Sequence, residues 1–177
     1  MSLFERHCNE IQNSIQLNKN KKVIFSFLEK AFLEVIGHKL FTILKFDKNS
    51  FMLDRIFTNK PFDYPLFGVK NLQKSFWQKS VFEEGNIFIG YNSKDIKNSF
   101  PDYDIILKLG CESVMNIPIV QNEIIKGSVN ILHKKNWYGK RHIQSAKLLT
   151  SFINNFKSKN YKKVFGKNLS LKKVIYL

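Results

Sequence analysis

Three polar residues that can form hydrogen bonds with a small molecule lie in two neighbouring segments of strand-like sequence. Asn116 alternates with apolar residues in segment 112–120, and Ser128 and Asn130 alternate with apolar residues in segment 124–133. Amide and hydroxyl groups both donate and accept hydrogen bonds. A buried polar group without a partner costs about 1–3 kcal/mol, so these side chains must bond to each other, to water, to loop backbone or to a ligand.

The two segments are joined by a connection of hairpin length, which indicates antiparallel pairing. We expect Val120 to lie opposite Ile124, and this register puts the three polar side chains on one face of the pair. The opposite face is almost entirely apolar, and we expect it to pack beneath the terminal helices of the chain. It carries Ser113, Met115, Ile117, Ile119, Val129 and Ile131.

The long segment 60–110 is the expected cover of the polar face, because irregular segments of this length commonly form lids or binding loops. It supplies aromatic and charged side chains that suit the wall of a small-molecule site. The pattern favours a pocket over a satisfied polar network that ties the loop to the sheet, and both interpretations stay open at this point. The candidate ligand-binding residues are Tyr64, Trp77 and Tyr103 as aromatic walls, Lys70 and Asp102 as charge contacts, and Asn116, Ser128 and Asn130 as the polar floor.

The rest of the sequence predicts the elements that position these residues. Apolar residues recur at helical spacing near both ends, and Asn20 and Gly37 are residue types typical of a helix N-cap and C-cap. A period of two between them indicates strands. The expected helices are 3–17, 21–36, 74–83, 101–109 and 139–156, and the expected strands are 39–46, 51–58, 86–90, 112–120 and 124–133. This order predicts an α+β domain with an antiparallel sheet rather than a doubly wound fold.

The composition is that of a folded domain with a basic tail. The chain has 177 residues, of which 44% are hydrophobic, and this is enough for one core. The formal net charge is +15, yet only three of the 29 basic residues are arginine, the residue best suited to phosphate and guanine contacts. Segment 157–177 holds seven lysines and no acid. We interpret the lysines mainly as a solvated surface, with an anionic partner as the alternative.

The sequence shows neither a membrane span nor a common catalytic motif. No apolar run approaches the roughly 20 residues of a membrane helix, and the N-terminus lacks an apolar signal region, so we expect a cytoplasmic protein. The two cysteines, Cys8 and Cys111, make no disulfide framework or zinc site, and the four histidines show no ligand spacing. Motifs for nucleotide hydrolysis and for a serine nucleophile are absent.

Several short motifs occur in an order that resembles a known family. They are residues 109–120 (LGCESVMNIPIV), residues 127–133 (GSVNILH) and the pair Trp137-Tyr138. Upstream, the same pattern includes Tyr64-Pro65, Lys70, Trp77 and Phe100-Pro101-Asp102. Over residues 20–156 the chain resembles a GAF domain, of a single-domain bacterial subgroup that is related in shape to PAS sensors.

The resemblance implies a central antiparallel sheet of five or six strands with the terminal helices on one face. On the other face it implies a pocket covered by loops and short helices. It further implies a domain at 1–156, with its core at 20–156, that binds a metabolite without catalysis. The signal would pass through a homodimer of the terminal helices or through an unlinked partner. The sequence leaves the identity of the ligand or cofactor unknown.

Two other functions are weighed against this one. A nucleic-acid or anionic-surface binder would use the lysine-rich tail 157–177, and its affinity would fall steeply as salt rises; nucleic acid is the less favoured partner. The resemblance also includes an enzymatic branch, the free methionine sulfoxide reductases, in which a thiolate attacks sulfur. Cys8 lies on the apolar stripe of the first expected helix, Cys111 lies at a loop junction, and cysteines are absent from the middle loops. We therefore expect no enzyme.

Overall fold

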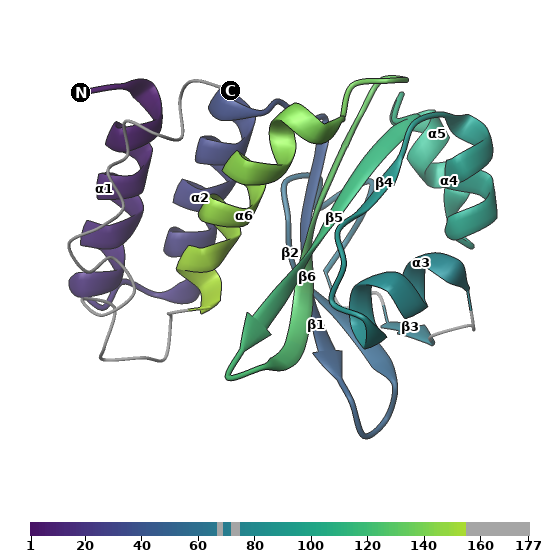
Figure 1. The fold of residues 1–177 in the computed structure, drawn as a ribbon, viewed down its shortest axis with the longest axis horizontal. Helices are drawn as coiled ribbons and strands as arrows, with labels where there is room; N and C mark the ends of the chain where they lie inside the picture. Colours follow the sequence, from purple (N-terminus) through teal and green to yellow (C-terminus); the bar gives the residue numbers. More distant parts are fainter. Residues whose placement is uncertain (67–68, 72–74, 155–177) are drawn as a thin grey trace. The chain divides into compact units, whose positions relative to one another are not determined.

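A computed structural model describes residues 1–66, 69–71 and 75–154 of the chain (Figure 1). Its internal contacts divide the described residues into two compact units, one of residues 1–36 with residues 141–154, and one of Gly37–Lys140. The predicted basic tail, residues 157–177, lies outside the described residues. Among the helices that are described, none is long and apolar enough to cross a lipid bilayer.

The first unit is helical. It contains α1 (Leu3–Gln16), α2 (Lys21–Val35) and α6 (Lys140–Asn154), and α1 contacts α2. Ser2 and Glu5 form a capping box at the start of α1, and the Asn20 side chain accepts a hydrogen bond of 3.0 Å from the Val23 amide at the start of α2. The three long helices predicted from apolar spacing and the predicted cap at Asn20 are therefore confirmed over the described residues.

The second unit is built on a six-stranded sheet in the order β3-β2-β1-β6-β5-β4 (Figure 1). The strands are β1 (Leu40–Asp47), β2 (Met52–Thr58), β3 (Val69–Asn71), β4 (Phe88–Gly90), β5 (Ser113–Gln121) and β6 (Ile124–His133). Every pair of neighbouring strands is antiparallel. The predicted α+β class and the predicted antiparallel sheet are confirmed, and β1 and β6 are its central strands.

The predicted register of the β5–β6 hairpin is wrong by two residues. A two-residue turn closes the hairpin with positive φ values of 50° and 63°, and Val120 pairs with Ile125 rather than with Ile124. A bulge between Ile119 and Val120 shifts the pairing by one further residue, so the rest of the hairpin differs from the predicted register by two residues. Because side chains alternate with a period of two, a shift of two positions keeps each of them on its predicted face. The polar side chains therefore share a face, and Asn116 lies directly opposite Asn130.

A second bulge, in the β1–β2 pair, decides which side chains of β2 lie on this same face. Thr42 pairs with Thr58, but beyond the bulge the partner of Leu44 is Arg55. The side chains of paired residues project to the same face of the sheet. On the face of Thr42, β2 therefore presents even-numbered residues before the bulge and odd-numbered residues beyond it. Arg55 is thereby turned to the face of Thr42, where an unbulged register would place Ile56.

Short helices and loops of the middle segment cover the face that carries Asn116 and Asn130. The covering elements are α3 (Phe76–Gln78), the π-helical turn η1 (Lys79–Glu83), α4 (Ser93–Ser99) and α5 (Tyr103–Lys108). Their buried apolar side chains form one cluster with those of the sheet, including Trp77, Phe82, Phe100, Ile106, Leu44, Val114 and Leu132. The predicted short helices are present, and α4, which the sequence analysis missed, is capped at its start by the Asn92 side chain.

The opposite face of the β5–β6 hairpin is apolar and buried, as predicted. Its apolar side chains are Met115, Ile117, Ile119, Val129 and Ile131. Ser113 is the polar exception, and its hydroxyl accepts a hydrogen bond of 3.3 Å from the Tyr138 amide. The two faces of the hairpin therefore differ sharply in chemistry, and only one of them gathers polar side chains.

Candidate ligand-binding pocket

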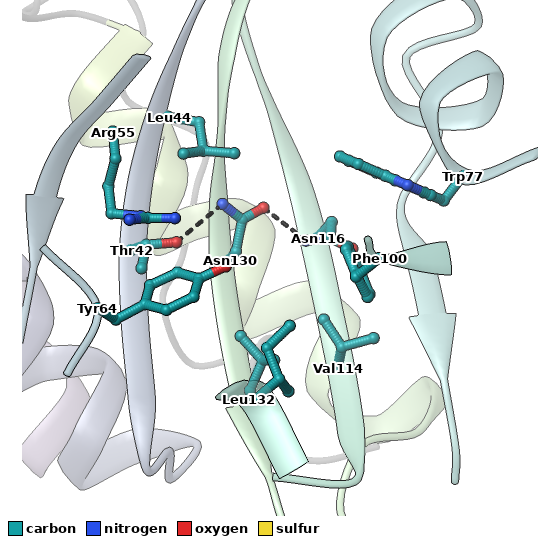
Figure 2. A pocket seen from close by; sticks show the side chains of 11 residues that line it. Thr42, Leu44, Arg55, Tyr64, Trp77, Phe100, Val114, Asn116, Asn130 and Leu132 are labelled. Carbon is teal, nitrogen blue, oxygen red and sulfur yellow. Dashed lines mark hydrogen bonds between the residues drawn. The ribbon is translucent and has the colours of Figure 1, made fainter. Parts of the chain in front are cut away.

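A cavity lies on the polar face of the sheet, within the second unit. It is partly open to solvent, and its volume is about 30 Å³. Its walls come from four strands, from the loop after β2, from α3, from the residue that follows α4 and from α5 (Figure 2). The lining residues are Thr42, Leu44, Arg55, Tyr64, Trp77, Phe100, Ile106, Val114, Asn116, Asn130 and Leu132.

The floor of the cavity is a chain of hydrogen bonds centred on Asn130. Its side-chain oxygen accepts bonds from Asn116 Nδ2 at 2.5 Å and from the Ser128 hydroxyl at 2.9 Å. Its amide nitrogen donates to the Thr42 hydroxyl at 3.1 Å. All four side chains are buried. The hydrogen-bonded network and the cavity, which the sequence left open as alternatives, are therefore both present, because Thr42, Asn116 and Asn130 of the network also line the cavity.

The network leaves one acceptor without a partner. Asn116 uses its amide nitrogen for Asn130, and its buried Oδ1 has no hydrogen-bond partner among the described residues. Asn116 is 1% exposed and lines the cavity. An unsatisfied buried carbonyl of this kind costs about 1–3 kcal/mol, so this oxygen marks a point where a hydrogen-bond donor would be favourable.

Arg55 brings a positive charge to one side of the cavity. Its Nη1 donates to the Pro65 carbonyl at 2.6 Å, and its Cζ lies 3.6 Å from the centroid of the Tyr64 ring. The side chain is 4% exposed, and its Nε has no hydrogen-bond partner within the described part of the chain. A guanidinium stays protonated in proteins, so the cavity has a buried, permanent cation at its wall (Figure 2).

Tyr64 is held in place by Asp102. The Tyr64 hydroxyl donates a hydrogen bond to the Asp102 carboxylate. Burial, reinforced by this nearby carboxylate, raises the pKa of the Tyr64 hydroxyl above its ordinary value, so the phenol stays protonated and remains a donor. Asp102 therefore orients the ring against which Arg55 packs, and it does so from outside the cavity lining.

Trp77 forms the wall on the other side of Asn130 from Arg55 (Figure 2). Its ring packs against Phe100 and Phe82, with centroid distances of 5.0 Å and 5.6 Å. The indole is 3% exposed, and its Nε1 donor has no hydrogen-bond partner in the described residues. Buried tryptophan N–H groups usually find an acceptor, so Trp77 is at once a core aromatic and an unsatisfied donor at the cavity.

Similar solved structures identify the fold. The GAF domain of an Acinetobacter phosphoenolpyruvate-protein phosphotransferase aligns with 88% of this chain and 93% of its own, at 9% identity and a TM-score of 0.67. The GAF domain of a two-component sensor histidine kinase from Bacillus halodurans aligns with 84% of this chain and 99% of its own, at 12% identity and a TM-score of 0.65. The chain has the GAF fold.

A third similar structure shows the range of proteins that share the GAF fold. It is the chromophore-binding domain of a bacteriophytochrome from R. palustris, with 85% of this chain and 60% of that chain aligned, 9% identity and a TM-score of 0.61. No family model matches the sequence, and no curated protein is significantly similar to it. At these identities the likeness establishes the fold, and the ligand has to be argued from the pocket itself.

The GAF fold brings four of the eight predicted site residues to the cavity: Tyr64, Trp77, Asn116 and Asn130. Ser128 and Asp102 lie behind this lining and hold Asn130 and Tyr64. Tyr103 is partly buried against the apolar cluster, with Lys97 Nζ 6.0 Å from its ring centroid, and does not line the cavity. The backbone of Lys70 pairs with Leu53 in the β3–β2 ladder, and its side chain lies outside the described part of the structure.

The remaining lining residues were not predicted from the sequence. Val114 and Leu132 were already on the predicted polar face, and Phe100 was part of a motif, so a signal for these three existed. Thr42 follows from the alternation along β1 once that strand is known to pair with β6. Arg55 had no such signal, because a bulge rather than the alternation of β2 turns it to the cavity.

The structure gives no support to cysteine chemistry at this pocket. Neither Cys8 nor Cys111 lines it. Burial raises the pKa of the Cys8 thiol to about 12 and that of Cys111 to about 11, so neither is a thiolate near neutral pH. The described residues also contain no cluster of three histidine, cysteine or acidic side chains that could hold a metal ion.

Proposed function

We propose that this chain is a non-catalytic sensor module that binds a small molecule in the pocket on the polar face of its sheet. One observation carries the proposal: three of the residues that line one cavity each carry a buried polar atom without a hydrogen-bond partner among the described residues. These atoms are Arg55 Nε, Trp77 Nε1 and Asn116 Oδ1.

The residues that carry the unsatisfied atoms line a single cavity. Each buried polar group that lacks a partner costs about 1–3 kcal/mol, and proteins keep such groups rare. A network built only to hold a loop on a sheet would satisfy its own members, as Asn130 does with its three neighbours. Three unsatisfied atoms from three separate elements around one cavity support a binding site, because a bound molecule can complete all of them at once.

The size of the cavity limits the ligand. A cavity needs a volume of about 10–15 Å³ to hold one water molecule. The cavity volume of about 30 Å³ therefore corresponds to two or three waters. Pockets for drug-sized ligands measure roughly 300–1,000 Å³. The ligand that fits this arrangement of side chains therefore has only a few non-hydrogen atoms, and a larger one requires the covering segment to move.

A homodimer of the terminal helices is the proposed signalling unit. The helical unit leaves large apolar side chains exposed, among them Leu17 at 70% and Leu33 at 47%, and burial of such groups favours association. Light scattering on the full chain tests this part of the proposal. A mass of twice 20.8 kDa supports it, and a mass of 20.8 kDa at every concentration contradicts it.

The proposed binding is tested by filling the cavity. Native mass spectrometry of the gently purified chain should show an added mass that leaves on denaturation. In Val114→Phe, the larger ring occupies the cavity at a position that is 0% exposed, so the added mass should disappear. Overpacking should lower the free energy of unfolding by about 1–3 kcal/mol without unfolding the chain.

The matched control is Val120→Phe, on the same strand but outside the lining, which should keep the added mass. The proposal is contradicted if the unmodified chain carries no molecule and if no compound of a broad metabolite library raises its melting temperature. It is equally contradicted if Val114→Phe and Val120→Phe retain ligand to the same extent.

A further inference from the structure

The charge of Arg55 points to the electrical character of the ligand. Its contacts among the described residues, the Pro65 carbonyl and the ring and hydroxyl of Tyr64, are all neutral. No ion pair within the described residues involves Arg55. Asp102 directs its carboxylate to the Tyr64 hydroxyl. A buried charge without an ionic partner is unfavourable. An anionic group of the ligand beside the unpartnered Nε of Arg55 would therefore stabilise this wall most.

The other two unpartnered atoms specify a second group on the ligand. Trp77 Nε1 can only donate a hydrogen bond, and Asn116 Oδ1 can only accept one. A single group that satisfies both must accept from the indole and donate to the amide oxygen. A hydroxyl does both, whereas an ammonium group only donates and an ether oxygen only accepts.

The positions of the side chains indicate where the anionic group and the hydroxyl group of the ligand would lie. Figure 2 shows Arg55 and Trp77 on opposite sides of Asn130, with Asn116 on the side of Trp77. The anionic group therefore belongs at the end near Arg55 and the hydroxyl at the end near Trp77. Apolar side chains, Leu44, Val114 and Leu132, line the space around them and can contact a short carbon skeleton.

We infer that the pocket binds a small hydroxycarboxylate, with its carboxylate at Arg55 and its hydroxyl between Trp77 and Asn116. The inference rests on the proposed function and adds the chemical class of the ligand. Arg55 suits a carboxylate because the planar guanidinium matches its geometry. The small cavity restricts the skeleton to about two or three carbons.

A series of compounds built on glycolate tests this inference on the unmodified full chain. Isothermal titration compares glycolate and lactate with acetate, which lacks the hydroxyl, and with glycine, which replaces it by an ammonium group. Glycolamide removes the charge and keeps the hydroxyl, and inorganic phosphate tests for a general anion site. Ligands this small are limited to micromolar affinity at best, so each titration extends into the millimolar range.

Glycolate or lactate should bind tightest of the series. Acetate, glycine and glycolamide should each bind at least about 5- to 150-fold more weakly, because each leaves at least one buried group of the pocket unsatisfied. Equal or tighter binding of any of these three, or of phosphate, overturns the inference. The absence of binding by every hydroxycarboxylate overturns it as well.

Two variants assign the groups to their partners. In Arg55→Gln the charge is lost, so the preference for glycolate over glycolamide should vanish; in Trp77→Phe the indole donor is lost, so the preference for glycolate over acetate should shrink. Each comparison is a ratio of two affinities of one variant, and a structural role alone would leave that ratio unchanged. Arg141→Gln, at an exposed position of α6, is the control that should keep both preferences.

The two proposals fail in different ways. If native mass spectrometry finds a molecule of another class and the glycolate series does not bind, the ligand class is wrong and the binding function stands. If the chain carries no molecule, no metabolite raises its melting temperature and the series does not bind, both are wrong.

Discussion

Two buried basic side chains, His7 in the helical unit and Arg55 in the sheet unit, are treated in opposite ways by the fold. His7 is 1% exposed, its Nε2 lies 2.9 Å from Glu34 Oε2, and its Nδ1 lies 3.5 Å from Glu10 Oε2. Arg55 is 4% exposed, and its contacts among the described residues are the Pro65 carbonyl and the ring and hydroxyl of Tyr64. Where a buried base has a structural role, the chain supplies carboxylates from neighbouring turns and helices. At Arg55 the described residues supply no carboxylate that forms an ion pair with it, which fits a site completed by a ligand.

The largest expected effect comes from His7→Leu, which removes the base that the carboxylates face. Hydrogen bonds to charged groups contribute about 1.5–3 kcal/mol, so the free energy of unfolding should fall by about that amount. Urea unfolding of the ligand-free chain measures it. Asn9→Leu, at an exposed position of the same helix, is the control and should stay within about 0.5 kcal/mol. Equal stability of both variants would remove the contrast with Arg55.

A smaller effect, or one of opposite sign, is expected from Arg55→Met in the absence of ligand. The substitution removes a buried charge that lacks an ionic partner, and apolar replacement of buried charges is often neutral or stabilising. The carbonyl of Pro65, an exposed residue, can then bond to water. The free energy of unfolding should therefore change by less than about 1 kcal/mol or rise. A loss of more than about 2 kcal/mol in the same urea experiment would show that Arg55 is mainly structural.

The smallest effect is a pH dependence confined to the helical unit. The hydrogen bond from His7 is the main cause that lowers the pKa of Glu34 below its ordinary value of 4.5. A carboxyl group with a lowered pKa in the folded state stabilises the fold above its ordinary pKa, and this contribution is lost as the pH falls through the folded value. The stability difference between wild type and Glu34→Gln should therefore shrink as the pH falls below about 4.5.

The matched control for this measurement is Glu83→Gln, which removes an exposed carboxylate of η1, outside the helical unit. A difference between wild type and Glu34→Gln that persists unchanged at acidic pH would show that the Glu34 charge does not support the helix pair. Arg55 has no carboxylate that pairs with it among the described residues. Arg55→Met should therefore show no comparable pH dependence in this range.

Local sequence patterns were enough to predict most of the secondary structure. Helix caps such as Asn20 and apolar spacing near both ends depend only on residues close in the chain, and α1, α2 and α6 formed as expected. The short helix α4 was missed although Asn92 caps it, because its seven residues contain a single buried apolar side chain, Ile96. A helix so short has almost no periodicity to detect.

The polar floor could also be predicted, although its register could not. Alternation with a period of two fixed the common face of Asn116, Ser128 and Asn130, and an error of two residues in the pairing left that face unchanged. The same error hid which groups bond: Asn116 lies opposite Asn130, so the amides meet directly, and Ser128 supports them from one side.

What the sequence determined by itself is therefore the set of elements, the α+β class and the two unlike faces of the β5–β6 hairpin, since each depends on spacing along a single segment. Only the tertiary structure decided which of the predicted polar residues reach the cavity and that Arg55 joins them. The bulge in the β1–β2 pair shifts the facing side chains of β2 by one position, and one position is the full difference between the two faces of a sheet. The charge that Arg55 brings to the pocket wall thus comes from strand pairing between residues that no local pattern connects.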